Sequence, residues 1–199
     1  MVQRRPAACL TMTMPILSSS AKSNQRRQTV LGAAVSCFAR KGLYGTTTHE
    51  IAERAGISQP YVYRLFPDKP SLFASSVEFV SDLMATTLAE KLSEAAASVN
   101  TPENLQTAAR SAYTDFVVES DVMRFLMQAN CATDEPIVAN AVRACYAKQV
   151  MVVSEHIRSD EAVRQWFGDG MLENVVASLG LADINEPWAR TLSGGLTRS

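Results

Sequence analysis

The stretch TTTHEIAERAGISQPYVYRLFPDKPSL, residues 46–72, predicts two short helices joined by a tight turn, with a third helix starting after Pro67. Thr47 and Glu50 have the spacing of a capping box, in which two side chains satisfy the first N–H groups of a helix. Gly56 is suited to end this helix, because glycine readily adopts the left-handed conformation found at helix C-termini. We therefore expect a short helix that begins near Thr47 and ends at Gly56.

The second short helix has two different faces. Ser58 can cap it, and Pro60 fits its first turn, where a missing N–H costs little. Val62 and Phe66, four residues apart, form an apolar inner face. The outer face carries Gln59, Tyr61, Tyr63 and Arg64. Two short helices around a glycine turn, the second with such an outer face, are typical of a helix-turn-helix that reads DNA.

The run KGLYGTTTHEIAERAGISQPYVYRLFPDKPSLF, residues 41–73, strongly resembles the DNA-binding domain of the TetR family of bacterial transcriptional regulators. The resemblance covers roughly residues 24–84. Its matching positions are Gly42, Thr46, Thr47, Ile51, Ala52, Ala55, Gly56, Ile57, Ser58, Tyr63, Phe66, Lys69 and Leu72. It implies an all-α fold in which an N-terminal three-helix domain, with the helix-turn-helix at about residues 47–66, precedes a helical ligand-binding and dimerisation domain.

Several side chains of the motif are candidates for contacts with double-stranded DNA. Gln59 suits adenine and Arg64 suits guanine, because each can form paired hydrogen bonds with that base. The resemblance implies phosphate contacts by Tyr63 and Lys69. The full expected set is Thr46, Thr47, Ser58, Gln59, Pro60, Tyr61, Tyr63, Arg64 and Lys69. The alternative for each is a solvated surface residue, and Leu65 is apolar where many relatives have His or Tyr.

The charge is unevenly distributed along the chain. The net charge is −1, from 19 basic and 20 acidic residues. Residues 1–70 contain ten Lys or Arg and three acidic residues, a balance of +7, which leaves −8 for the rest. A basic front half suits a surface that faces phosphates, and an acidic rear half does not.

The rear half is predicted to be helical, because Gly and Pro are sparse there and apolar residues recur at helical spacing. We expect helices near 24–41, 70–98, 102–119, 121–132, 136–158 and 160–181, the last divided in two by Gly168–Asp169–Gly170. The expected domains are a disordered leader at 1–23, the DNA-binding domain at 24–84, the ligand-binding and dimerisation domain at 85–184 and a flexible tail at 185–199.

We expect the chain to form a homodimer, because a single helix-turn-helix buries too little area for strong specific binding. The resemblance places the interface at about residues 161–181. There, Gly168, Gly170, Ala177 and Ser178 would permit close approach of two helices, and Leu172, Val175, Val176 and Leu179 would supply apolar area. A two-fold interface implies a palindromic operator.

The resemblance also implies a pocket for a small apolar or amphipathic effector whose binding releases the repressor from DNA. Soft and aromatic residues of the rear half are candidates to line it: Phe116, Met123, Met127, Cys131, Tyr146, Met151, Trp166 and Phe167. The alternative for each is an ordinary core position, since Met and aromatic residues at helical spacing usually belong to the core.

Other chemistry finds little support in the sequence. The four cysteines show no metal-ligand spacing, so we expect reduced thiols in a cytoplasmic protein, with an oxidant-sensing role for Cys131 and Cys145 as the alternative. No nucleophile, metal or phosphate-loop motif predicts an enzyme, a cofactor or a metal site. The leader lacks the features of an export signal, and we expect no membrane segment. Two alternatives are a basic arm that contacts DNA and a true start at Met12 or Met14.

Overall fold

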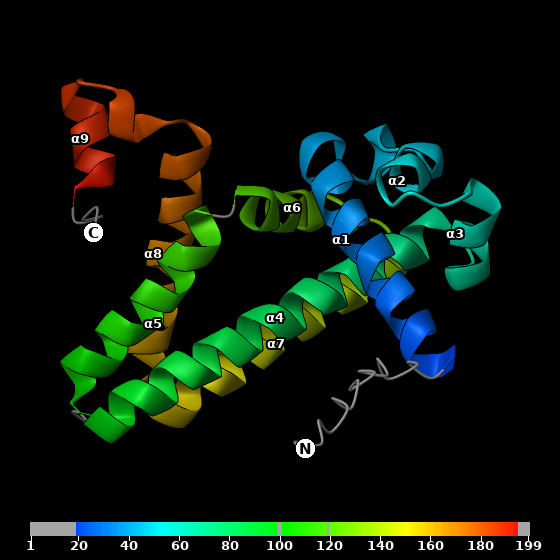
Figure 1. Cartoon of the computed structure of the whole chain (residues 1–199). Coiled ribbons are helices and arrows are strands. Elements are labelled where there is room, and N and C mark those ends of the chain that lie inside the picture. The colour runs from blue at the N-terminus through cyan, green and yellow to red at the C-terminus, as the bar shows by residue number, and fades with distance from the viewer. Residues whose placement is uncertain (1–18, 99–100, 119, 195–199) are drawn as a thin grey trace, which may run out of the picture.

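The computed structural model describes residues 19–98, 101–118 and 120–194, and this part of the chain is all-α (Figure 1). The predicted leader lies largely outside it, in residues 1–18. The elements are α1 (Ser19–Gly45), α2 (Thr48–Arg54), α3 (Gln59–Leu65), α4 (Lys69–Ser98), α5 (Pro102–Val118), α6 (Ser120–Cys131), α7 (Pro136–His156), α8 (Asp160–Ser178), the 3₁₀ helix η1 (Leu181–Asp183) and α9 (Pro187–Ser193). We call α1–α3 the head and α4–α9 the body.

The head is built around aromatic side chains that also come from the body. Phe38 of α1, Phe73 of α4 and Phe125 of α6 are fully buried. The ring centroids of Phe38 and Phe73 are 4.6 Å apart, and those of Phe73 and Phe125 are 5.0 Å apart. Such tilted contacts add specific attraction to the area that the rings bury. The head therefore shares its core with α4 and α6.

Gly42 breaks α1 close to its end. Its φ of 65° and ψ of −173° are non-helical, so residues 43–45 leave the direction of the first helix. A Cβ at this position would lie 2.6 Å from Oε1 of Gln128 in α6. Two residues later, the Tyr44 hydroxyl donates a hydrogen bond of 2.5 Å to the Asp134 carboxylate, beyond the end of α6. The break thus lies where head and body are pressed together.

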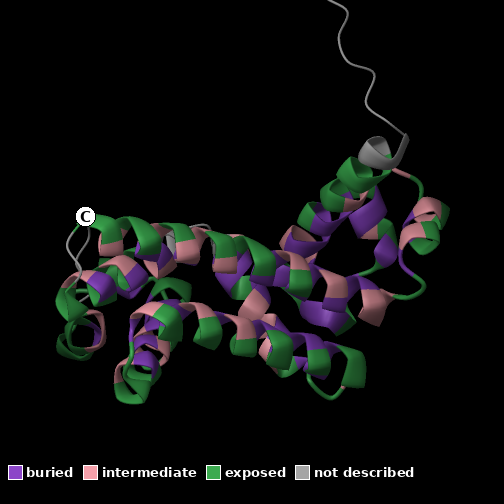
Figure 2. Ribbon diagram, turned by 90° about the horizontal axis from the view of Figure 1, so that it is seen from below, coloured by how far each residue is buried: buried purple, intermediate pink, exposed green. Residues whose placement is uncertain are grey.

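The body consists of two helix pairs that cross at an angle. In Figure 1, α4 and α7 lie side by side along the length of the molecule, and α5 lies beside α8. Gln149 of α7 donates to the carbonyl of Ser81 in α4 at 3.2 Å, and Lys148 pairs with Asp82. Figure 2 shows the buried residues on the facing sides of these helices and the exposed residues on their outer sides.

Three features of the helices differ most from the sequence prediction. α1 begins at Ser19 rather than at residue 24. The predicted division of α8 at Gly168–Gly170 is wrong, because the helix runs unbroken and Gly170 lets the Tyr113 ring approach its backbone. Residues 187–193, within the expected tail, form α9 with Ala189 fully buried.

Within the part of the chain that the structure describes, one helix, α4, is long and apolar enough to cross a membrane by length and composition alone. More than half of its most apolar window, 56%, is buried against the rest of the structure. That burial is the pattern of a core helix, whose apolar residues contact other helices.

Candidate nucleic-acid interface and ligand cavity

The capping box at the start of α2 is present as predicted. The backbone N–H of Glu50 donates to Thr47 Oγ1 at 3.2 Å, and the N–H of Thr47 donates to Glu50 Oε2 at 2.9 Å. The Lys41 ammonium also pairs with the Glu50 carboxylate. The hydrogen bond from Lys41 and those from Thr47 lower the pKa of Glu50 from 4.5 to about 2. The start of α2 is therefore fixed by bonds on both sides of the cap.

The turn between α2 and α3 also follows the prediction. Gly56 has a φ of 67°, and the N–H of Ile57 donates to the carbonyl of Ala52 at 3.0 Å, which closes the helix end. Ser58 occupies the cap position of α3 with extended backbone, but its side chain makes no capping hydrogen bond. Val62 and Phe66 are buried, so the opposite face of α3 points outward.

A buried hydroxyl that sequence reasoning missed organises this outer face. Thr48 is only 6% exposed, and its Oγ1 accepts a hydrogen bond from Gln59 Nε2 at 2.8 Å. The same oxygen lies 3.0 Å from the Tyr63 hydroxyl. Both side chains come from α3 and are held by one residue of α2, so their directions are restricted before any ligand arrives.

Tyr61 and Arg64 form a second, cationic part of the face. The Arg64 guanidinium lies 4.4 Å from the centroid of the Tyr61 ring, and that of Arg26 lies 6.0 Å from it. Hydrogen bonds from Arg26 and then Arg64 lower the pKa of the Tyr61 phenol. Arg26 belongs to α1, and its part in this cluster appears only in the fold.

The structure divides the remaining predicted DNA contacts. Thr46 is 1% exposed and donates to the carbonyl of Cys37 at 3.3 Å, so its side chain packs inside the head instead of reaching a phosphate. Lys69 is half-buried, and its Nζ donates to the carbonyl of Thr46 at 3.0 Å. Thr47, Ser58 and Pro60 are exposed. The burial of Thr46 removes its side chain from the expected DNA-contacting set.

Arg27, another basic residue of α1, has a structural role. Its Nη1 donates to the carbonyl of Leu65 at 3.1 Å, and its guanidinium lies 4.2 Å from the centroid of the Phe66 ring. It therefore neutralises the C-terminal end of α3 and packs against the head's core. Within the described residues, the exposed cations of the outer face are Arg26 and Arg64, both beside Tyr61.

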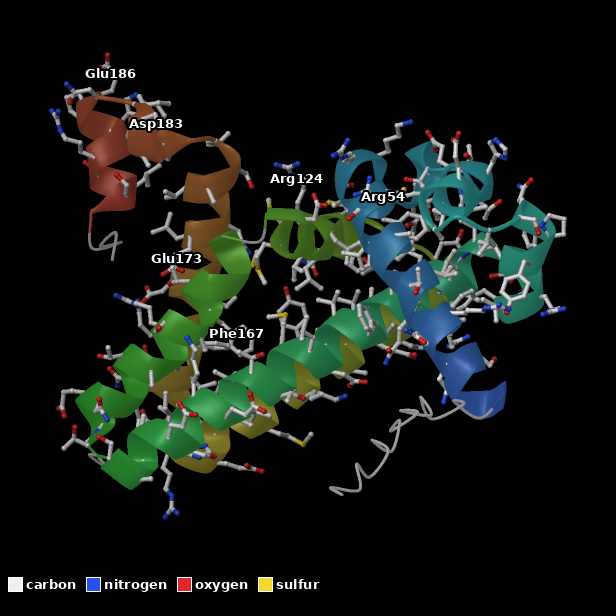
Figure 3. The ribbon with its side chains drawn as sticks, in the orientation of Figure 1. Arg54, Arg124, Phe167, Glu173, Asp183 and Glu186 are labelled. Atoms are coloured by element: carbon white, nitrogen blue, oxygen red, sulfur yellow. The ribbon has the colours of Figure 1, made fainter. Side chains whose placement is uncertain are left out.

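A mostly apolar cavity of about 50 Å³ lies inside the body. Its lining residues come from α4 to α8: Val77, Met84, Tyr113, Leu126, Met127, Ala129, Asn130, Val142, Cys145, Tyr146, Gln149, Trp166, Phe167, Met171 and Asn174. Figure 3 labels Phe167 in the angle between the α5–α8 pair and the α4–α7 pair. The cavity therefore forms where the two helix pairs meet α6.

Four of the predicted pocket residues line this cavity: Met127, Tyr146, Trp166 and Phe167. Met123 does not, because it is buried in the core shared with the head. Cys131 and Met151 are exposed and also lie outside it. The side chain of Phe116 lies outside the described part of the structure. The corrections share one cause, which is that composition does not show which side of a helix faces which neighbour.

Sequence reasoning missed the polar residues of the cavity. Gln149 and Asn174 are 3% and 4% exposed, and Asn174 Nδ2 lies 2.7 Å from the Tyr113 hydroxyl. Burial raises the pKa of Tyr113 well above its ordinary range, so its hydroxyl is neutral. Amide side chains give no signal in the sequence, because helical periodicity marks only the apolar positions.

The outer side of α8 carries an apolar stripe. Met171, Val175 and Leu179 are 45%, 37% and 59% exposed and follow one another at four-residue spacing. Gly168 has open space around it, but Gly170 faces the Tyr113 ring and Val176 is buried. Of the residues predicted for the dimer contact, Gly170 and Val176 are thus used inside the chain.

The thiols of the described residues do not form a metal site, and no cluster of three or more His, Cys, Asp or Glu occurs there. Burial raises the pKa of Cys145 and of Cys37, which makes both thiols less reactive at neutral pH. Cys131 is exposed. A pair of Cys131 and Cys145 as an oxidant sensor thus has one partner in an unfavourable environment.

Comparison with known proteins agrees with the geometry of the head. Residues 30–75 match the family described as "Bacterial regulatory proteins, tetR family". An uncharacterized HTH-type transcriptional regulator of Mycobacterium tuberculosis is 48% identical over 56 residues, which are 27% of this chain and 30% of the relative. The HTH-type transcriptional repressor AcnR of Corynebacterium diphtheriae is 35% identical over 77 residues, or 39% of this chain and 40% of AcnR. The chain thus matches less than half the length of these relatives.

Solved structures extend the likeness to the whole fold. A TetR-family transcriptional regulator from Streptomyces coelicolor superposes with a TM-score of 0.57 at 24% identity, covering 85% of this chain and 76% of that one. The fatty acid degradation regulator FadR from Bacillus halodurans superposes with a TM-score of 0.63 at 14% identity, covering 87% and 97%. At these identities the likeness concerns the arrangement of helices.

Proposed function

We propose that the chain is a DNA-binding transcriptional regulator of the TetR family and that it acts as a ligand-released repressor, because residues 30–75 match that family and the helices are arranged as in a solved TetR-family regulator. The observation that carries this proposal is the outer face of α3. There, Thr48 holds Gln59 and Tyr63, while Arg26 and Arg64 flank Tyr61. A restricted set of polar and cationic side chains on an exposed helix is what a major groove accepts.

The contacts divide into base reading and phosphate positioning. Arg64 is exposed at the end of α3, so it can reach a base edge or a phosphate without leaving a buried partner. Gln59 Nε2 has two N–H groups, so its amide can keep the hydrogen bond to Thr48 and still pair with adenine through the other N–H and Oε1. The hydroxyl of Tyr63, a residue that is 48% exposed, and the Lys69 ammonium suit phosphate oxygens. Arg26 joins the set as a cation beside Tyr61.

A homodimer would place two such faces on a palindromic operator. The stripe of Met171, Val175 and Leu179 on α8 offers apolar area for a two-fold contact with a second copy. Two heads about one helical turn of DNA apart then read equivalent half-sites, which multiplies the contacts of a single motif.

Release by an effector requires a path from the cavity to the head, and α6 supplies one. Met127 and Asn130 of α6 line the cavity. Phe125 of the same helix packs against Phe73 in the core of the head, and Gln128 lies against Gly42. An effector that moves α6 would therefore change the position of the head, and the protein would shift toward a state that fits the operator poorly.

A mobility-shift titration with the DNA upstream of the protein's own gene tests the proposal. We expect Arg64→Ala to weaken binding by about tenfold to a hundredfold, because a base-reading or phosphate contact is lost. Arg158→Ala, which removes the same charge from the exposed end of the body, is the matched control and should leave affinity within about twofold.

The double variant Tyr63→Ala and Lys69→Ala tests the phosphate contacts. It should weaken binding to all sequences and reduce the dependence of affinity on salt. Because Lys69 also holds the carbonyl of Thr46, a circular dichroism melt must first show that the head is folded. A folded wild-type protein that shifts no DNA at low salt would contradict the proposed function.

A further inference from the structure

We propose that the effector is an uncharged ring compound with a carboxamide-like group, offering two hydrogen-bond donors and one acceptor. That this compound regulates DNA binding rests on the proposed function. That it binds here is argued from the cavity alone. The group would be held by three residues of the cavity wall, Gln149, Trp166 and Asn174.

The three residues share an unusual property. Each is at least nine-tenths buried, with 3% exposure for Gln149, 4% for Asn174 and 9% for Trp166. Within the described residues, Gln149 Oε1, Asn174 Oδ1 and Trp166 Nε1 have no hydrogen-bond partner. Buried polar atoms nearly always have hydrogen-bond partners, because a buried donor or acceptor without a partner destabilises the fold. Three such atoms around one cavity indicate a polar occupant.

The neighbours of these atoms decide which hydrogen-bonding groups the occupant needs. Gln149 Nε2 donates to the carbonyl of Ser81, which can only accept, so Gln149 Oε1 is left as an acceptor. The indole N–H of Trp166 is a donor only. Asn174 is engaged through Nδ2 with the Tyr113 hydroxyl, which leaves Oδ1 as the second acceptor. The complementary ligand group has two donors and one acceptor, as a primary carboxamide does.

The charge of the ligand follows from the rest of the wall. Among the residues that the structure describes, the cavity lining contains no Asp, Glu, Lys or Arg. A charged ligand would lose its hydration without gaining an opposite charge, which is far more costly than burying a hydrogen-bonded neutral group.

The apolar part of the wall favours a ring. Tyr113, Tyr146, Trp166 and Phe167 form a chain of aromatic contacts with centroid distances of 4.8 to 5.8 Å. The volume of about 50 Å³ is smaller than the roughly 150 Å³ of an engineered cavity that binds benzene. Met84, Met127 and Met171 also line the space, and their flexible thioethers can move aside for a ring.

Benzamide, toluene and benzoate are the probes that test the proposal. The chain has two tryptophans, and Trp188 is exposed on α9, so Trp188→Phe leaves Trp166 as the only indole reporter. Binding is followed by Trp166 fluorescence and by calorimetry on the full chain without DNA. We expect benzamide to bind and benzoate to bind at least about tenfold more weakly.

Gln149→Met removes the amide while keeping the length of the side chain. We expect benzamide binding to fall at least about tenfold and toluene binding to stay within about twofold or improve. Retained toluene binding shows that the variant cavity is folded, and Asn174→Leu is a second variant with the same expectation. Gln106→Met, at an exposed position of α5, is the matched control and should bind benzamide like the parent.

Three results would each overturn the proposal: no benzamide binding to the parent, equal losses of benzamide and toluene in Gln149→Met, or benzoate binding as tightly as benzamide. Water as the sole partner of the three atoms predicts the first result. A mobility shift separates this inference from the proposed function. A protein that binds DNA but not benzamide refutes the ligand class alone, and one that binds benzamide but no DNA refutes the regulator alone.

Discussion

The head and the body treat their buried polar groups in opposite ways. In the head, the Thr48 hydroxyl holds two side chains of α3, and the Thr46 hydroxyl and carbonyl both have partners. In the body, Gln149, Trp166 and Asn174 each leave an atom unpartnered around the cavity. A surface that reads DNA gains from side chains fixed in advance, whereas a cavity that binds a ligand needs free hydrogen-bonding groups.

The largest effect that we expect concerns the packing beside the cavity. In Gly170→Ala, the new Cβ would lie 2.9 Å from the Tyr113 ring, which is partly buried and held against Trp166. We expect a loss of about 2 kcal/mol in the free energy of unfolding, measured by denaturant titration. Gly168→Ala, in open space on the same helix, should instead be neutral or stabilise by up to about 1 kcal/mol. Equal effects would show that α5 and α8 are not packed this closely.

The second prediction concerns a variant that removes the hydrogen-bond network around Thr48 in the head. Thr48→Val keeps the shape of the side chain and removes the hydroxyl that holds Gln59 and Tyr63. We expect affinity for the operator to fall about tenfold, because both side chains lose their restriction. Binding of benzamide in the body should not change. An unchanged mobility shift would mean that the Thr48 network does not prepare the face of α3.

A smaller effect should appear when acid reaches the capping box. The folded-state pKa of Glu50 is about 2, below its ordinary 4.5, so its stabilisation is complete above pH 4.5 and is lost as the pH falls through about 2. Glu50→Gln retains a capping-box side chain but loses the charge. The melting temperatures of wild type and variant should differ at neutral pH and converge in acid. A constant difference would assign the effect to something other than ionisation.

The smallest effect concerns Glu173, whose burial raises the pKa of its carboxyl. A raised folded-state pKa means that the stabilisation is complete below the ordinary value of 4.5 and is lost as the pH rises through the folded value. Glu173→Gln should therefore melt slightly higher than wild type at neutral pH and lose this advantage in acid. A variant that melts lower at neutral pH would show that the nearby Arg110 outweighs the burial.

The two regions also differ in how far the sequence predicted them. The capping box of Thr47 and Glu50 and the turn at Gly56 were predictable, because each is decided by residues within a few positions. The burial of Thr46 and the part played by Arg26 depend on how α1 crosses the motif, which local spacing does not show.

In the body, the positions of the helices along the chain were predictable, but the neighbour that each side of a helix contacts was not. Apolar periodicity placed α4 to α8 to within a few residues but did not tell Met123, which faces the head, from Met127, which faces the cavity. The continuity of α8 was missed because glycine at 168 and 170 weakens a helix locally, while packing of Gly170 against Tyr113 compensates for that weakness. Such compensation comes from residues far away in the chain.

The pairing of α4 with α7 has a consequence for biosynthesis. Ser81 and Gln149, which join the two helices, are 68 residues apart in the chain. At a synthesis rate of roughly 5 to 20 residues per second, the apolar side of α4 waits about 3 to 14 seconds on the ribosome before its partner is made. The aromatic core of the head is likewise incomplete until Phe125 of α6 emerges. Until α7 is made, the nascent chain thus exposes the side of α4 that α7 later covers, and transiently exposed apolar surface of this kind favours aggregation.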